Sequence, residues 1–153
     1  MAYLSTQASL EAIAGQHRVK LFGDKDRDGT VDAQTLTQAL QYGDQVVKSQ
    51  LFPRYGSQVS AWDSDNSDTP LFASGLSDKI CLHWLSESTA IGSKTISTGY
   101  TEALRMLSMI AGYQMSLPGI DDISNEVAVE EMSDPYTEEA YDSDDGKNYI
   151  IIV

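Results

Sequence analysis

The chain has 153 residues, of which 41% are hydrophobic and 22% are charged, and its formal net charge at pH 7 is −13. This length suits one domain built on a single hydrophobic core, and the composition is that of a folded protein. Residues 1–120 hold twelve acidic and nine basic side chains, whereas residues 121–153 hold eleven acidic side chains and only Lys147. So few spare cations argue against binding nucleic acid through its phosphates.

Targeting and cysteine-based classes are also excluded. No run of 18 apolar residues is present, and the first five residues lack the basic and apolar regions of a signal peptide. We therefore expect no membrane span and a protein that is made and kept in a cytosol. The single Cys81 rules out a disulfide framework and a cysteine-based zinc site, and it is predicted to be a small core residue.

Motifs that carry catalysis are missing from the sequence. His17 and His83 have no carboxylate or thiol at a helical spacing that would complete a metal site. Cys81 and His83 would point about 200° apart on a helix, so they would not form a nucleophilic pair. Neither a Gly-x-Ser-x-Gly elbow nor a Gly-rich phosphate loop occurs. The sequence predicts a protein that is not an enzyme and requires no cofactor.

Two short helices are predicted first. Ser5 or Thr6 is suited to cap the first helix, because a hydroxyl accepts hydrogen bonds from the free amides of a first turn, and Gly15 is suited to end it. Residues 16–22 predict a second helix that ends at Gly23. The apolar residues expected to face the core are Leu10, Ile13, Ala14, Val19 and Phe22.

Acidic side chains alternate in the loop that follows. Oxygen-bearing residues match positions 1, 3, 5, 7 and 9 of a twelve-residue calcium loop, namely Asp24, Asp26, Asp28, Thr30 and Asp32. Gly29 fits position 6, but Thr35 replaces the bidentate glutamate of position 12. The sequence therefore predicts weak calcium binding at most. The alternative is a polar turn whose aspartates cap the next helix and whose Gly29 takes a positive φ.

A long helix is predicted from Ala33 to Pro53. Proline is expected to end it, because proline has no amide hydrogen and crowds the preceding turn. The residues on its apolar face are Leu36, Leu40, Gly43, Val47 and Leu51. Residues 54–69 show no hydrophobic periodicity and contain Gly, Asn and several Ser and Asp residues, so they predict a surface loop in which Trp62 has no evident role.

Two more helices are predicted before residue 120. Asp68 or Thr69, followed by Pro70 at the first helical position, begins a helix that runs to Ser88. Its broad stripe marks it as the central element, and Gly75 is expected to permit a close neighbour. The last helix is expected over residues 98–113. The inward residues of the two helices are Ala73, Leu76, Ile80, Trp84, Tyr100, Leu104, Leu107 and Ile110.

The predicted organisation is a helical domain over residues 1–119 and an arm over residues 120–153. Residues 120–146 scatter single hydrophobic side chains among acids and cannot bury enough area to fold alone. The strongest strand signal follows, and it predicts a partner-binding strand at Tyr149, Ile150, Ile151, Ile152 and Val153. The expected fold is mainly α, a small helical bundle with a long extended acidic C-terminal arm ending in a β-strand.

A family resemblance rests on short motifs spread over residues 1–119. In order they are Met1-Ala2-Tyr3, Asp24-Lys25-Asp26-Arg27-Asp28-Gly29, Arg54-Tyr55, Tyr100-Thr101-Glu102-Ala103-Leu104-Arg105, Ile110-Ala111-Gly112 and Ser116-Leu117-Pro118-Gly119. Their order and spacing resemble the Mu-type phage head-protein family of connector or head-completion proteins. Residues after 120 lie outside this resemblance.

The resemblance implies a structural subunit of the virion at the head-tail interface. Such a subunit forms a homo-oligomeric, twelvefold ring between the portal protein and a tail or stopper protein. DNA passes through the lumen without specific binding, and acidic walls would keep the duplex from sticking. Two other hypotheses remain open. One is a calcium-responsive binding protein that uses the Asp24 to Asp32 loop, although a second loop is missing, and the other is a small hydrolase with an unfamiliar motif.

Overall fold

A computed structural model describes residues 2–89 and 93–120. These residues form five α-helices and one 3-10 helix without any strand, which confirms the predicted mainly helical fold. In chain order the elements are α1 (Gln7–Ala14), α2 (Gln16–Gly23), α3 (Ala33–Tyr55), η1 (Gly56–Ala61), α4 (Leu71–Ser88) and α5 (Lys94–Ala111).

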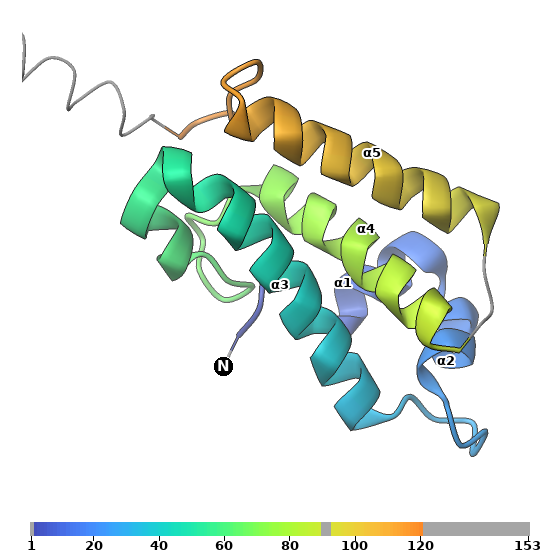
Figure 1. The fold of residues 1–153 in the computed structure, drawn as a ribbon. Coiled ribbons are helices and arrows are strands. Elements are labelled where there is room, and N and C mark those ends of the chain that lie inside the picture. Colours follow the sequence, from blue (N-terminus) through green and yellow to red (C-terminus); the bar gives the residue numbers. More distant parts are fainter. Residues whose placement is uncertain (1, 90–92, 121–153) are drawn as a thin grey trace, which may run out of the picture.

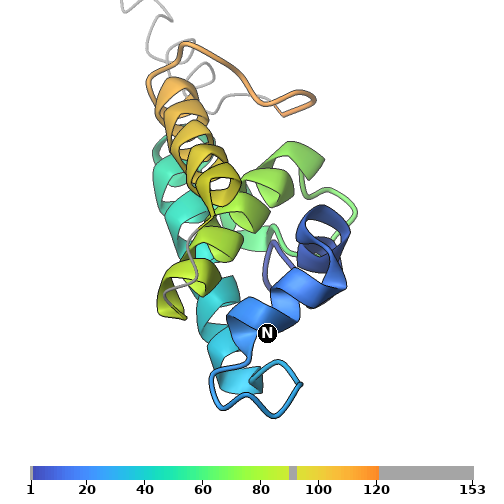
Figure 2. The same cartoon turned by 90° about the vertical axis from the view of Figure 1, so that its right-hand side faces the viewer.

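Helix α4 is the centre of the bundle, as its broad apolar stripe predicts. It contacts all four other α-helices, and α1 and α2 pack on each other and on α4 (Figure 2). Helices α3 and α5 run in one direction and α4 in the other, so the C-terminal ends of α3 and α5 lie beside the N-terminal end of α4 (Figure 1). The chain reaches residue 120 at that end, whereas α2 and the loop before α3 lie at the opposite end.

The first two helices follow the prediction closely. Thr6 Oγ1 accepts a hydrogen bond from the Ser9 amide at 3.1 Å, and Ser9 Oγ accepts one from the Thr6 amide at 3.0 Å, so the cap is reciprocal. Gly15, with φ of 86°, separates α1 from α2. The prediction fails for Ile13, which is 55% exposed, because this eight-residue helix meets the core through the buried Leu10 and the half-buried Ala14.

The buried face of α3 differs by one residue from the predicted face in its first half. The buried residues are Thr35, Ala39, Gly43, Val47 and Leu51, each four positions apart, while Leu36 and Leu40 are half-buried beside them. Pro53 does not end the helix, because it removes only its own amide donor and lies in the last turn. The helix ends instead at Gly56, which has a φ of 55° and donates its amide hydrogen to Phe52 O.

The segment after α3 is not the surface loop that the sequence predicts. Val59 of η1 and Trp62 are both buried, and the Trp62 ring lies 6.1 Å from the Tyr55 ring, measured between centroids. A 3-10 helix of six residues is too short, and has too tight a turn, to give the periodicity of an α-helix. Trp62 is therefore a core residue.

Helix α4 begins at Leu71, one residue later than predicted, and Pro70 occupies the N-cap position. The Thr69 hydroxyl does not cap the helix. It donates to Asp63 O at 2.7 Å and accepts from the Asp63 amide at 2.9 Å, which closes the turn that precedes the helix.

Helices α3 and α4 make their closest approach at Gly43. A β-carbon added there would overlap Cys81 Sγ and would lie 3.0 Å from the backbone oxygen of Ser77. The predicted close neighbour at Gly75 is absent among the described residues, because apart from the adjacent residues and the helix's own backbone none of their atoms lies within 4 Å of a β-carbon built at that position. The two glycines differ only in whether another helix packs against them, and the sequence does not show that contact.

Helix α5 begins four residues before the predicted start. Its buried side chains are Ala103, Leu107 and Ile110, whereas Tyr100 and Leu104 are half-buried. Trp84 of α4 is half-buried as well, so Trp84 and Leu104 both pack against the core, as predicted, but neither is fully buried. The face of α5 that meets the bundle is centred on Leu107, and Leu104 lies at its edge.

Candidate functional site

The segment that leads into the arm is held by Arg54, near the end of α3. Arg54 is only 3% exposed. Its Nη1 donates to Ile110 O at 2.6 Å and to Met115 O, and its Nη2 donates to Ser116 Oγ at 2.7 Å. A guanidinium presents its donors in a fixed fork, so several acceptors are needed to satisfy it once it is buried. The turn after α5 supplies them.

Tyr55 adds to the same attachment. Its hydroxyl accepts a hydrogen bond from the Leu117 amide at 2.9 Å. The Arg54 guanidinium carbon lies 4.8 Å from the centre of the Tyr113 ring and 5.3 Å from that of Tyr55. We call the contacts of Arg54 and Tyr55 with residues 110–117 the arm clasp. It joins the chain just before residue 120 to the end of α3.

The arm clasp brings together two motifs that carried the family resemblance. Arg54-Tyr55 and Ser116-Leu117-Pro118-Gly119 are some sixty residues apart in sequence and in direct contact in the structure. Sequence reasoning assigned Arg54 to a surface loop. The available signal was its position, since it lies seven and three residues after Val47 and Leu51 and so extends their buried face.

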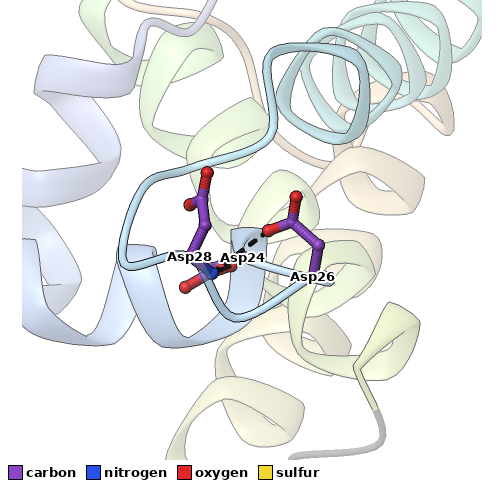
Figure 3. A group of neighbouring side chains, drawn as sticks. All are labelled: Asp24, Asp26 and Asp28. Carbon is purple, nitrogen blue, oxygen red and sulfur yellow. Dashed lines mark hydrogen bonds between the residues drawn. The ribbon is translucent and has the colours of Figure 1, made fainter.

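The predicted metal residues lie between α2 and α3. One carboxylate oxygen from each of Asp24, Asp26 and Asp28 lies within 4.8 Å of the others (Figure 3). The loop's own amides already bind these carboxylates. Asp24 accepts from the Asp28 amide at 3.1 Å and from the Gly29 amide at 2.8 Å, and Asp26 accepts from the Asp28 amide at 3.2 Å. Gly29 has a φ of 88°, as predicted.

The other two predicted ligands have roles within the loop. The Thr30 hydroxyl donates to Asp28 Oδ1 at 2.6 Å. Asp32 Oδ2 accepts from the Lys25 amide at 2.8 Å, so Asp32 closes the loop and does not cap α3 with its side chain, contrary to the polar-turn interpretation. Thr35, at position 12, is buried in the first turn of α3. Three of the five residues thus share one cluster, and calcium binding stays a prediction.

The three carboxylates differ in their electrostatic environment. Hydrogen bonds from the Thr30 hydroxyl and amide lower the pKa of Asp28. The Asp28 amide acts the same way on Asp26, but desolvation and the carboxylates of Asp24, Asp28 and Asp32 outweigh it and raise the pKa of Asp26. A bound cation would reduce the repulsion that these carboxylates exert on Asp26.

The predicted partner-binding strand, Tyr149 to Val153, lies outside the described residues. The structure therefore describes the root of the arm and not its end.

A carboxylate is buried where α1 meets α4. Asp78 is 5% exposed, and its Oδ1 lies 2.6 Å from Ser9 Oγ. Burial raises the pKa of Asp78, and the Ser9 hydroxyl lowers it by a smaller amount. Ser9 has one hydroxyl hydrogen and two acceptors in reach, since Thr6 O lies 2.8 Å away. A protonated Asp78 would donate to Ser9 and leave that hydrogen for Thr6.

Cys81 and His83 take structural positions. Cys81 is fully buried, as predicted, and burial raises the pKa of its thiol to about 12, so it is not a thiolate nucleophile at neutral pH. The His83 ring stacks on Tyr100 of α5, with 3.9 Å between centroids. Among the helices of the described residues, none has the length and apolar character needed to cross a bilayer.

The chain matches the model of a known protein family. The sequence model of the family described as "Bacteriophage Mu, Gp36" covers residues 4–133. No curated protein matches the chain. The family match includes both motifs of the arm clasp and extends 14 residues beyond the predicted limit at residue 119, into the acidic segment. A match over this much of the chain shows that the protein belongs to the Bacteriophage Mu Gp36 family of phage proteins.

Proposed function

We propose that the chain is a structural head-tail connector, or adaptor, subunit of a tailed phage. In this proposal it acts without catalysis, as one member of a twelvefold ring between the portal protein and a tail or stopper protein. The assembled ring resides in the virion at the head-tail interface. Membership of a phage Mu family supports a phage role, and the observation that carries the proposal further is the arm clasp.

The arm clasp supports assembly because it fixes where the arm leaves the bundle. A connector must present its extended segment to a neighbour in a defined direction, and ordering a loose segment on binding costs free energy. Arg54 and Tyr55 hold residues 110–117 before any partner arrives. That part of the ordering is already complete in the subunit.

The charge distribution supports a ring through which DNA moves. The net charge is −13, and 11 of the 23 acidic side chains lie in residues 121–153. Like charges keep a duplex from adhering to the wall during passage. Lys and Arg total only 10 in the whole chain, which agrees with passage and not with binding.

The predicted strand supports joining to a second protein. Burying its four large aliphatic side chains would contribute about 6–12 kcal/mol. Ordering five residues would cost about 5–10 kcal/mol, so burial alone nearly cancels against chain entropy. Backbone pairing with a preformed sheet edge supplies the surplus, and the portal or a neighbouring ring would provide that edge.

Deleting residues 149–153 tests the proposal. We expect circular dichroism and the denaturant midpoint to stay nearly unchanged, because the hydrophobic clusters of the bundle lie within residues 4–120. Incorporation into portal-containing head particles, measured by pull-down, should be lost. Truncated protein that incorporates at wild-type occupancy would reject strand addition, and a chain that stays monomeric with the portal present would reject the connector role.

Aspartate substitutions within the strand provide the matched control. Neighbouring side chains of a strand point to opposite faces. Ile150→Asp with Ile152→Asp should therefore reduce incorporation nearly as much as the deletion, whereas Ile151→Asp should reduce it less.

The second candidate is a calcium-responsive binding protein. The clustering of Asp24, Asp26 and Asp28 favours it. Thr35 weakens it, because a threonine hydroxyl does not replace a bidentate carboxylate. We rank it below the connector.

A further inference from the structure

An apolar groove opens at the end of the bundle far from residue 120. It has a volume of about 200 Å³ and lies between α1, α2, α4 and the first turns of α5. Ile13, Leu82 and Ile96 form its apolar wall. The 55% exposure of Ile13 has its explanation here, because Ile13 is the side of the groove that α1 provides. A large aliphatic side chain at such a position favours association with another apolar surface.

Two cations border this groove. The Arg18 side chain of α2 is exposed and makes no hydrogen bond or ion pair with any of the described residues. Lys79 of α4 forms a solvent-exposed ion pair with Glu102 of α5, with 3.4 Å between Nζ and Oε2. An apolar wall with cations at its edge fits a peptide segment that combines aliphatic and acidic side chains.

The chain itself contains such a segment. Residues 126–132 read Glu-Val-Ala-Val-Glu-Glu-Met, so every side chain is either apolar or acidic. The family match ends at residue 133 and therefore includes this stretch, whereas the predicted strand at 149–153 lies beyond it. Lys147 stands close to that strand, which makes it less suited to a groove bordered by cations.

The geometry favours a groove on another copy. From Ala111 back to Thr95 along α5 is sixteen residues, or about 24 Å at 1.5 Å per residue. The six steps from residue 120 to residue 126 span about 20 Å at most. The turn over residues 112–120 lies beyond the far end of α5 (Figure 1), which lengthens the path further. A neighbouring copy imposes no such path.

We propose that residues 126–132 of one copy dock in this groove of the neighbouring copy, with Val127 and Val129 on the apolar wall and the glutamates beside Arg18 and Lys79. The assumption that a second copy lies alongside rests on the proposed ring. Docking would direct the remaining residues of the arm toward the partner that the predicted strand binds.

Cross-linking of the full-length chain tests the proposal. The variant carries Thr95→Cys at the groove and Val129→Cys in the arm, and Cys81 is buried and will not compete. A short bifunctional thiol reagent should give a ladder of linked chains on a denaturing gel. Arg18→Glu with Lys79→Glu should reduce the ladder at least about fivefold, because exposed ion pairs each change an equilibrium severalfold. Glu126→Lys with Glu130→Lys should restore it.

Matched controls separate the groove from general charge and exposure. Arg105→Glu removes an exposed cation of α5 that does not line the groove, and it should leave the ladder unchanged. Ile13→Asp should reduce the ladder, and Leu21→Asp, at a similarly exposed residue of α2, should not. Circular dichroism checks that each variant folds.

Two outcomes would overturn the proposal. One is a ladder that survives reversal of Arg18 and Lys79, and the other is linkage confined within single chains. The experiment uses the purified chain without portal, so its failure is distinct from failure of the connector role. A normal ladder with no incorporation into head particles rejects the connector, and normal incorporation without a ladder rejects the groove.

Discussion

At the scale of single residues, Asp78 is a charge whose burial costs stability. Its folded-state pKa is raised above the ordinary value of 3.8, so the folded protein holds a proton more tightly than the unfolded chain does. The penalty is fully present above the folded-state pKa and disappears below the unfolded-state pKa. Stability contributed by this site therefore rises as pH falls through the folded-state pKa toward about 4.

Asp78→Asn should stabilise the protein at neutral pH and lose that advantage in acid. The amide keeps the shape of the carboxylate and can still accept a hydrogen bond from Ser9. The measurement is the denaturant midpoint at neutral pH and near the unfolded-state pKa. Asp44→Asn is the control, because it removes the ion pair of Asp44 with Lys48 at 3.0 Å and should therefore give no stabilisation at neutral pH. If Asp78→Asn lowered the midpoint at both pH values, the prediction would be wrong.

Leu107 and Leu104 form a second residue-scale test. Leu107 is 1% exposed and Leu104 is half-buried. Leu107→Ala should lower the free energy of unfolding by about 2–5 kcal/mol, the range for a large-to-small change in a core. Leu104→Ala should cost distinctly less. Equal losses in chemical denaturation would mean that Leu104 and Leu107 are equally buried, and hence that α5 is rotated about its axis.

At the scale of elements, the contact between α3 and α4 depends on Gly43. Gly43→Ala should lower the free energy of unfolding by about 1–3 kcal/mol, because its new methyl group meets the backbone of Ser77 as well as the Cys81 side chain. Gly75→Ala should raise it by about 0.5–1 kcal/mol, since alanine favours the helix and open space surrounds the site. Thermal denaturation of the pair decides this, and two losses of similar size would argue against the close approach.

The loop over residues 24–32, the aspartate loop, should respond weakly to calcium. Isothermal calorimetry should give an affinity far weaker than that of calcium sensors, because Thr35 supplies no bidentate carboxylate. Near-UV circular dichroism should change little, since the loop's own hydrogen bonds already fix Asp24, Asp26 and Asp28. Submicromolar affinity with a reorientation of α2 and α3 would promote the calcium-responsive alternative. Asp26→Asn should remove whatever binding is observed.

Helix boundaries were predictable where local chemistry sets them. Thr6 and Gly15 delimit α1 by a cap and a positive φ, and both effects act within one turn of chain. Contacts between elements far apart in the sequence were harder to predict. Trp62 and Arg54 looked like loop residues, because their burial depends on η1 and on the turn after α5. Arg54 also runs against the ordinary preference of charged side chains for the surface.

At the scale of the whole molecule, the two ends of the bundle differ in kind. One end carries the arm clasp, and the other carries the aspartate loop (Figure 1) and the apolar groove lined by Ile13, Leu82 and Ile96. A subunit with an outgoing segment at one end and a receiving surface at the other can join identical copies head to tail. Such heterologous contacts close into a ring when the rotation between neighbours is right. The sequence indicated the arm from its charge but gave no sign of the groove, which four helices build together.

The arm clasp also decides how the subunit carries a load. Tension applied to the arm reaches Arg54 and Tyr55 before it reaches the body of α5. These residues belong to α3, whose buried face extends from Thr35 to Tyr55. A pull along α3 therefore strains many contacts at once, whereas without the arm clasp the pull would act first on the last turn of α5.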